Sequence, residues 1–400
     1  MIITELQQLY AAHPNVEGMY RLLQDNSVRH LYCSGLCASA ASLFSSVLIQ
    51  RVECPFVFIL GDLEEAGYFY HDLTQILGTE QVLFFPSSFR RAIKYGQKDA
   101  ANEILRTEVL SRLQKGEEGL CVVTYPDALA EKVVSRKELG DKTLKLHLGE
   151  YVDYVYEPGQ YAVRGSIIDV FSFSSEFPFR IDFFGDEVES IRTFEVESQL
   201  SKEKKENIVI VPDLSHSLEQ RGNGGMVSFL DFLQPDTLLA MKDFLWLRER
   251  IQTVHDEALT AQAIAAREAE ENGLISLDGK LIDGGEFTLR ALDFRRIEFG
   301  TKPTETPDAT VTFNTTAQPI FHKNFDLVAE SFHDYLSRNY ALYICSDSLK
   351  QTERIRAIFE DRGDNISFTS VERTLHEGFA DDALRLCIFT DHQLFDRFHK

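Results

Sequence analysis

Two kinds of segment alternate along the first 124 residues. Short apolar runs of strand length occur at residues 30–33, 56–60, 82–85 and 120–124. Segments with the helical spacing of apolar residues precede and separate them, at residues 3–25, 38–49, 63–77 and 100–114. Strands that alternate with helices predict a parallel, doubly wound α/β sheet.

A different pattern fills residues 150–201, where β-type runs follow one another without helices. The first run covers 161–171 and is broken by Gly165, which we interpret as a bulge or a close backbone approach. A second run at 179–184 ends in a turn at 185–187, and a third covers 188–196. Tight turns join only antiparallel neighbours, so these runs predict an antiparallel meander of three strands.

Polar and apolar residues alternate along the second of these strands, as in a half-buried sheet. We therefore expect Arg164, Arg180 and Arg192 on an exposed surface, among the acidic residues Asp169, Asp182, Asp186, Glu187 and Glu189. Phe183 and Phe184 are consecutive, so one of the two rings should point away from the core.

Two interpretations of this surface remain open. A solvated face with cross-strand ion pairs and one half-buried ring explains the composition without any function. An exposed Phe beside arginines is also the composition of a protein–protein anchor.

The rest of the chain predicts further α/β structure. Strands are expected at 208–211 and 237–241, a long acidic helix at 244–271, and a boundary in the Pro/Thr-rich stretch 300–308. A second small α/β domain follows, with helices at 326–338 and 348–362 and strands at 341–345, 366–370 and 384–389. We interpret Lys202 to Asn207 as a solvated turn, because acids interleave with its lysines.

Two short motifs suggest chemistry that we do not assign. Residues 282–287 approach a cyclase-type Gly-Gly-Asp-Glu-Phe motif, but an Asp-Gly-Gly hairpin turn explains them. Asp391 and His392 could pass for a catalytic pair, but no nucleophile accompanies them, so a structural role is favoured. We expect no catalytic residue in this chain.

Composition sets limits on partners and location. Net charge is −22, so the surface repels a phosphate backbone overall, and DNA binding by this chain alone is not expected. The six cysteines form no CxxC pair and no histidine lies at zinc-finger spacing, which indicates neither a metal site nor a disulfide framework. With neither a signal pattern nor an apolar stretch of membrane-spanning length, a cytoplasmic protein without membrane contact is expected.

The first strand–loop–helix lies where a phosphate-binding P-loop would lie. Laying the pattern G-x-x-x-x-G-K-[ST] over this loop places Gly35 first and Ser42 last. Ala40 then stands where the second Gly belongs, and Ala41 where the Lys belongs. Without the lysine the loop lacks its positive charge on the phosphates, so we expect no useful nucleotide binding and no cofactor.

The 150–201 region resembles a known family. The runs Ala162-Val163-Arg164-Gly165-x-Ile167-Ile168-Asp169-Val170-Phe171, Arg180-Ile181-Asp182-Phe183-Phe184-Gly185-Asp186-Glu187-Val188, Ser190-Ile191-Arg192 and Ser198-Gln199-x-Ser201 are similar to the UvrB-homology module of bacterial transcription-repair coupling factors (Mfd proteins). The excision-repair protein UvrB carries a looser version of these runs. UvrB keeps Gly-Lys-Thr in its P-loop, so the alanines at 40 and 41 favour the coupling factors.

The resemblance implies a domain organisation over essentially the whole chain. It implies a degenerate P-loop domain of the RecA/UvrB type at 1–127, a UvrA-binding domain inserted at 128–207, the completion of the first domain at 208–305, and a small α/β domain at 306–400. The family has a further helix before the Glu157-Pro158-Gly159 turn, whereas here Gly149-Glu150 runs directly into Tyr151.

The resemblance also implies partners and site residues. The small domain would bind UvrA, and the positions that match the family's UvrA contacts are Arg164, Arg180 and Phe184. The parent would be a translocase that uses ATP and Mg²⁺ and contacts RNA polymerase and DNA through parts absent here. Its own C-terminal domain would mask the UvrA surface. The alternative is a UvrB-like module that binds damaged DNA or residual nucleotide.

Overall fold

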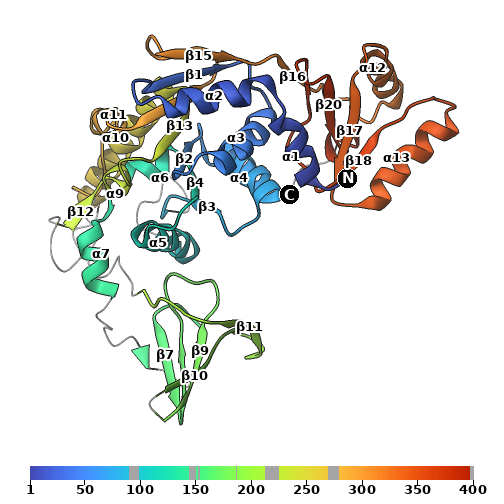
Figure 1. Cartoon of the computed structure of the whole chain (residues 1–400). Helices are drawn as coiled ribbons and strands as arrows, with labels where there is room; N and C mark the ends of the chain where they lie inside the picture. Colours follow the sequence, from blue (N-terminus) through green and yellow to red (C-terminus); the bar gives the residue numbers. More distant parts are fainter. Residues whose placement is uncertain are drawn as a thin grey trace.

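The computed structural model describes residues 1–89, 99–143, 150–151, 154–185, 187–211, 225–268 and 279–396. Two α/β units lie together at one end of the molecule, and a small β unit lies apart from them (Figure 1). The sheets of the two α/β units have seven and five strands, and the sheet of the small β unit has six. The mixed α/β class predicted from the sequence is confirmed.

The largest sheet is built from short strands, most of which are buried. Its seven strands are β1 (His30–Ser34), β2 (Phe56–Ile59), β3 (Val82–Phe85), β4 (Cys121–Thr124), β13 (Leu238–Lys242), β14 (Arg295–Phe299) and β15 (Ala309–Thr312). They lie in the order β15-β1-β14-β13-β2-β4-β3, and every neighbouring pair is parallel. The apolar strands β2 and β4 are buried along their whole length, which explains why they carry no polar alternation. The edge strand β15 instead alternates half-buried and exposed residues.

Helices pack around this sheet in two groups. The first group contacts itself closely and consists of α1 (Ile3–Ala11), α2 (Pro14–Gln24), α3 (Ala40–Arg51) and α4 (Leu63–Leu77). The second consists of α6 (Pro126–Ala130), α9 (Phe229–Phe232), α10 (Phe244–Glu268) and α11 (Gly284–Ala291), while α5 (Ala100–Lys115) packs on β3. In Figure 1 the first group is drawn in blue, and α10 and α11 are drawn in yellow at the left.

The segment 282–287 is a helix start and not the predicted hairpin turn. Asp283 caps α11 by accepting a hydrogen bond from the Glu286 N–H at 2.7 Å. Gly284 lies against the Arg248 carbonyl, where an added Cβ would stand 2.6 Å from the oxygen. Close helix packing therefore explains the glycine, and the acidic residue serves as an N-cap.

The small β unit has more strands than the sequence predicts. Its strands are β6 (Glu150–Tyr151), β7 (Gln160–Arg164), β8 (Ile167–Val170), β9 (Phe179–Phe184), β10 (Glu187–Phe194) and β11 (Ser201–Lys205). They lie in the order β11-β10-β9-β8-β7-β6, antiparallel except for the β6–β7 pair. The meander is therefore present.

Two expectations about this unit are wrong. Gly165 is not a bulge inside one strand: Arg164 pairs with Ile167, so Gly165-Ser166 is a hairpin turn, with the Gly165 φ at +61°. Lys202 to Lys205, part of the solvated turn expected at 202–207, lie instead in the edge strand β11, although all its side chains are exposed as expected. Exposed lysines on an edge strand oppose pairing with another chain. Asp186, Gly149 and the connection before Glu150 lie outside the described residues.

The ends of the small unit return to the larger one through a two-stranded ribbon. This ribbon pairs β5 (Val133–Val134) with β12 (Met226–Val227), and α7 (Arg136–Thr143) follows β5. The strand expected at 208–211 is absent: these residues belong to no helix or strand.

The second α/β unit has its own core. Its sheet contains β16 (Thr315–Ala317), β17 (Ala341–Ser346), β18 (Thr369–Glu372), β19 (Phe379–Asp381) and β20 (Leu386–Thr390), in the order β16-β19-β20-β17-β18. Its helices are α12 (Phe325–Ser337), α13 (Leu349–Asp361) and α14 (Asp391–Leu394). Because β15 belongs to the large sheet, this unit's own strands begin at Thr315, later than the boundary expected after residue 305.

Candidate partner-binding site

The three residues expected to bind a partner lie on one face of the small sheet. Asp169 on β8 stands directly opposite Arg180 on β9. Arg164 on β7 lies diagonally across from Asp169 and reaches it, and Phe184 follows Arg180 by four positions on the same strand. We call the face that carries Arg164, Asp169, Arg180 and Phe184 the arginine face.

The arginines are not the freely exposed groups that the sequence predicts. Asp169 is buried, with a side chain only 1% exposed, and both arginines pair with it. Arg180 binds it at two points, from Nε to Oδ1 at 2.7 Å and from Nη2 to Oδ2 at 2.8 Å. The expectation that Asp169 is one of several surface acids is therefore wrong.

Arg180 is held further by the loop after β10. Its guanidinium donates to the Gln199 backbone carbonyl and to the Gln199 side-chain oxygen, each at 3.2 Å, and it covers the ring of buried Phe194. The hydrogen bond to Asp169 raises the pKa of Arg180 above its ordinary value. With its side chain 15% exposed, this residue ties β8, β9 and the loop together.

Phe184 is the most exposed ring of the site. It lies at the end of β9 with 79% of its surface exposed, while Phe183 beside it is half-buried on the opposite face. The expectation that one of the two rings points outward is confirmed. Arg164 is intermediate, with a side chain 35% exposed and its guanidinium 5.0 Å from the centre of the Tyr154 ring.

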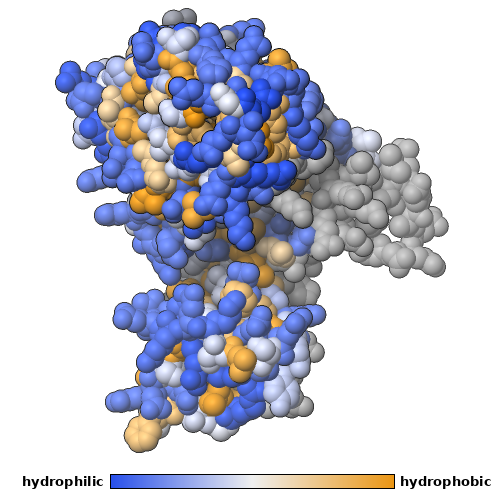
Figure 2. Space-filling model, turned by 90° about the vertical axis from the view of Figure 1, so that its right-hand side faces the viewer, coloured by the Kyte–Doolittle hydropathy of each residue, from blue (hydrophilic) through white to orange (hydrophobic). Residues whose placement is uncertain are grey.

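The surface of this unit is mostly hydrophilic, interrupted by a few hydrophobic residues (Figure 2). Val163 and Val188 are exposed on the face opposite the arginine face, because Val188 pairs with Phe183 and Val163 alternates with Arg164. They provide apolar positions that do not belong to the site.

The loop that resembles a P-loop in sequence joins β1 to α3. Gly35 has a φ of +80°, and a Cβ there would lie 2.0 Å from the Phe313 carbonyl oxygen. Ala40 begins α3 and Ser42 is buried, donating its hydroxyl hydrogen to Asp72 at 3.0 Å. The loop therefore starts a helix at the expected place.

A cavity of about 500 Å³ adjoins this loop, and its charged lining is mainly acidic. The acidic residues that line it are Asp62, Glu64, Glu65, Asp72 and Glu377. Lys242 also lines it, but its ammonium is ion-paired with Glu65. Carboxylates repel phosphate, so this lining does not favour a nucleotide. In the part of the chain that the structure describes, no group of three or more metal-ligating side chains could hold a metal ion.

The Asp391–His392 pair has no catalytic geometry. The two side chains are 4.0 Å apart, and His392 Nε2 lies 2.6 Å from the His376 carbonyl oxygen. Asp391 instead accepts from the Ser346 hydroxyl at 2.9 Å. The structure thus places both side chains in a hydrogen-bond network of the second α/β unit.

Two residues that hold the arginines of this face were missed as site residues, Asp169 and Gln199. Asp169 was counted as a surface acid and Gln199 only as part of the similar motif. The register of β8 against β9, which places Asp169 opposite Arg180, is the signal that finds the first. No local pattern finds Gln199, because its contact spans 19 positions.

Comparison with known proteins supports the resemblance. The sequence model of the UvrB interaction domain family matches residues 131–216. The chain is similar to the transcription-repair-coupling factors of Haemophilus influenzae (31% identical over 212 residues, 48% of this chain and 18% of the relative) and Bacillus subtilis (29% over 197 residues, 45% and 17%). The Staphylococcus aureus factor is 21% identical over 453 residues, which takes in 90% of this chain and 38% of the relative.

Each of these alignments covers less than two fifths of the relative's own length. No helix among the described residues is long and apolar enough to cross a bilayer. The resemblance drawn from the sequence is confirmed: residues 131–216 match the UvrB interaction domain, and the chain is similar to the N-terminal region of transcription-repair-coupling factors.

Proposed function

We propose that this chain is the UvrA-recruiting part of a transcription-repair coupling factor. The observation that carries the proposal is the 79% exposed ring of Phe184, on the same sheet face as Arg164 and Arg180, inside the segment that matches the UvrB interaction domain. An exposed ring next to fixed guanidinium groups suits a partner interface. The parent protein would link stalled RNA polymerase to nucleotide excision repair.

The three site residues take different roles in this proposal. Phe184 is the anchor that enters a pocket of UvrA. Arg164, with its side chain about a third exposed, presents positive charge to a carboxylate of the partner. Arg180, paired and mostly covered, is a positioning residue that fixes the face on which the other two lie.

The chain itself would be non-catalytic and without a cofactor. The alanines at 40 and 41 and the carboxylates around the neighbouring cavity support a degenerate nucleotide site. ATP and Mg²⁺ would serve the motor domains of the parent, an ATP-dependent DNA translocase. RNA polymerase and DNA would likewise bind parts outside this chain, and the parent's C-terminal domain would cover the UvrA surface.

The alternative function is a UvrB-like module that binds damaged DNA or residual nucleotide. A net charge of −22 opposes DNA binding by phosphate neutralisation. A mobility-shift titration at low salt that showed tight DNA binding would favour this alternative.

Co-purification with UvrA tests the proposal. The combined Arg164→Ala and Phe184→Ala substitutions should sharply reduce the UvrA that this chain retains. The combined Val163→Ala and Val188→Ala substitutions are the matched control, because they also remove exposed side chains from the small sheet, but from the opposite face. Equal retention by both double variants contradicts the proposal.

A further inference from the structure

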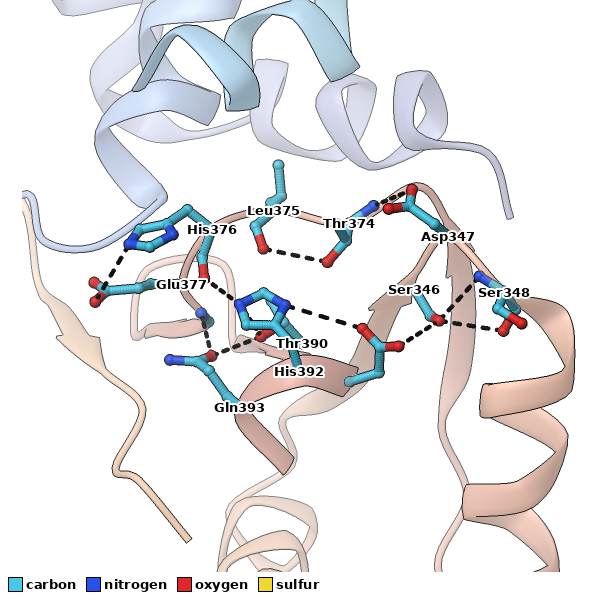
Figure 3. Close-up of polar contacts among 12 residues, drawn as sticks. Ser346, Asp347, Ser348, Thr374, Leu375, His376, Glu377, Thr390, His392 and Gln393 are labelled. Carbon is cyan, nitrogen blue, oxygen red and sulfur yellow. Dashed lines mark hydrogen bonds and ion pairs between the residues drawn. The ribbon is translucent and has the colours of Figure 1, made fainter. Parts of the chain in front are cut away.

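A loop of the second α/β unit reaches into the first one. It joins β18 to β19, and we call its residues Thr374–Gly378 the docking loop (Figure 3). Leu375 at its centre is fully buried and belongs to a hydrophobic cluster that joins the core of the first unit to residues of the second, such as Val371 and Phe379. Burying a leucine side chain removes apolar surface from water and so stabilises such a contact.

The docking loop bonds the N-terminus of α3 through its backbone. The Glu377 N–H donates to the Ser39 hydroxyl oxygen at 2.9 Å, and the Ser39 N–H donates to the Glu377 carbonyl oxygen at 3.4 Å. Ser39 precedes α3, yet its hydroxyl makes no capping bond to that helix. It accepts from the docking loop and is also hydrogen-bonded to Asp72 of α4.

Backbone groups of Gly35 and Cys37, in the P-loop-like segment, are also hydrogen-bonded within the chain. The Cys37 N–H donates to the Thr315 hydroxyl at 3.1 Å, and the Gly35 carbonyl accepts the hydrogen of the same hydroxyl at 2.5 Å. In a working P-loop, backbone N–H groups at this place bind phosphate oxygens. Here the N–H groups of Ser39 and Cys37 donate instead to the Glu377 carbonyl oxygen and the Thr315 hydroxyl oxygen.

The buried side chain of Asp72 accepts a hydrogen bond from His376 of the docking loop. The His376 N–H donates to Asp72 Oδ1 at 2.7 Å, while the Ser42 hydroxyl donates to Oδ2. Asp72 is only 2% exposed, so these bonds are shielded from water. The His376 ring stacks on Tyr68 of α4, with ring centres 3.5 Å apart and planes 10° from parallel.

Hydrogen bonds within the second α/β unit fix the conformation of the docking loop. The Thr374 N–H donates to Asp347, and the Gly378 N–H donates to Gln393 at 2.7 Å. His392 holds the His376 carbonyl from below, as Figure 3 shows. A loop held in this way loses little conformational entropy on docking.

We propose that residues 35–42 and Asp72 form a socket for the docking loop, which occupies the anion-binding position and locks the second α/β unit onto the first. The part about the anion-binding position rests on the proposed absence of nucleotide in this chain. The lock itself is independent of UvrA binding, so each can fail without the other.

Hydrogen exchange measured by mass spectrometry on the full chain tests the lock. Asp72→Ala removes the acceptor of the His376 N–H and leaves that donor in a site shielded from water without its hydrogen bond. Exchange should therefore rise roughly tenfold or more in two segments together, 36–44 and 372–380, because one opening exposes both. Glu64→Ala is the control: it removes a carboxylate from the same helix and cavity lining, but one that bonds only the Tyr68 hydroxyl in its described contacts.

A rise confined to 68–76, or to one of the two segments alone, overturns the proposal. If Asp72→Ala does not fold, as judged by circular dichroism, Ser39→Ala replaces it. That variant removes the acceptor of the Glu377 N–H and a hydrogen bond to Asp72, both within the proposed lock, so both segments should exchange several-fold faster. Unchanged exchange at 372–380 in Ser39→Ala overturns the proposal as well. Parallel UvrA pull-downs separate this outcome from failure of the proposed function.

Discussion

Asp169 and Arg180 face each other across neighbouring strands of the small sheet and are joined by two parallel hydrogen bonds of 2.7 and 2.8 Å. The same carboxylate holds Arg164. One buried acid therefore sets the positions of both arginines that the family resemblance points to. The guanidinium groups are fixed before a partner arrives, which lowers the entropy cost of binding.

Removing this acid should destabilise the small unit. Asp169→Asn leaves two half-covered arginines without their shared counter-charge, and breaking a buried ion pair costs about 3–5 kcal/mol. We expect much faster hydrogen exchange in residues 160–184 and a lower melting temperature for this unit, with the larger units unaffected.

Asp182→Asn is the matched control for that change. Asp182 pairs with Arg192 at 3.6 Å, and both side chains are about a quarter to a third exposed. Pairs of this kind contribute about 0–1 kcal/mol. Equal destabilisation by the two substitutions would contradict the central place given to Asp169.

The buried carboxyl of Asp72 predicts a pH-dependent stability. Burial raises its pKa to about 7, against an unfolded value of about 3.9. Between these values the folded chain holds a proton that the unfolded chain has released, so stability falls as pH rises. From pH 5 to 7 the loss amounts to roughly 2–3 kcal/mol, at about 1.4 kcal/mol per pH unit.

Comparing wild type with Asp72→Asn at several pH values checks this. The melting temperature of the variant should gain on the wild type as pH rises from 5 to 7. Asp25→Asn is the control, because hydrogen bonds from Ser27 lower the pKa of that exposed carboxyl and it is ionised throughout this range. A constant difference between Asp72→Asn and wild type would contradict the prediction.

Restoring the P-loop lysine should not restore nucleotide binding. Ala41 lines the acidic cavity, so in Ala41→Lys the new ammonium meets carboxylates and not phosphate. The backbone donors of Cys37 and Ser39 remain engaged by Thr315 and Glu377. Calorimetry with Mg-ATP should detect no micromolar binding to either chain. Micromolar binding by wild type that Ala41→Lys does not change would contradict the account and favour a residual nucleotide site.

The regular elements of the α/β units could be predicted because their signals are local. Helix α4 and strand β3 have the bounds that apolar spacing gives. The sequence predictions were wrong where a residue type suits two different local structures. Glycine suits a bulge and a hairpin turn equally, so Gly165 could not be assigned without the pairing of Arg164 with Ile167. Asp283 suits both a turn and a helix cap.

The site could be predicted only in part, because side-chain partners depend on register and docking. Alternation along β9 correctly places one phenylalanine outward. It does not reveal that Asp169 is buried, since the alternation of one strand says nothing of its neighbour's position. The contact of Asp72 with His376 spans 304 positions, and no local pattern in either segment indicates it.

Arg180 and Phe184 should differ in how their loss acts. Arg180→Ala removes a covered side chain that bonds Asp169 and Gln199, so UvrA binding and the stability of the small unit should fall together. Phe184→Ala removes an exposed ring, so binding should fall while the melting temperature stays within about 1–2 °C. Thermal melts alongside binding titrations distinguish the two, and a stable Arg180→Ala that still loses binding would make Arg180 a direct contact.

A titration of this chain with purified UvrA, comparing wild type with Phe184→Ala and Val188→Ala, tests the central claim most directly. A buried aromatic anchor is worth 2 kcal/mol or more, so Phe184→Ala should weaken binding at least about thirtyfold. Val188→Ala, on the opposite face, should bind as wild type does. Wild-type affinity in Phe184→Ala, or no binding of UvrA by the unmodified chain, would contradict the account.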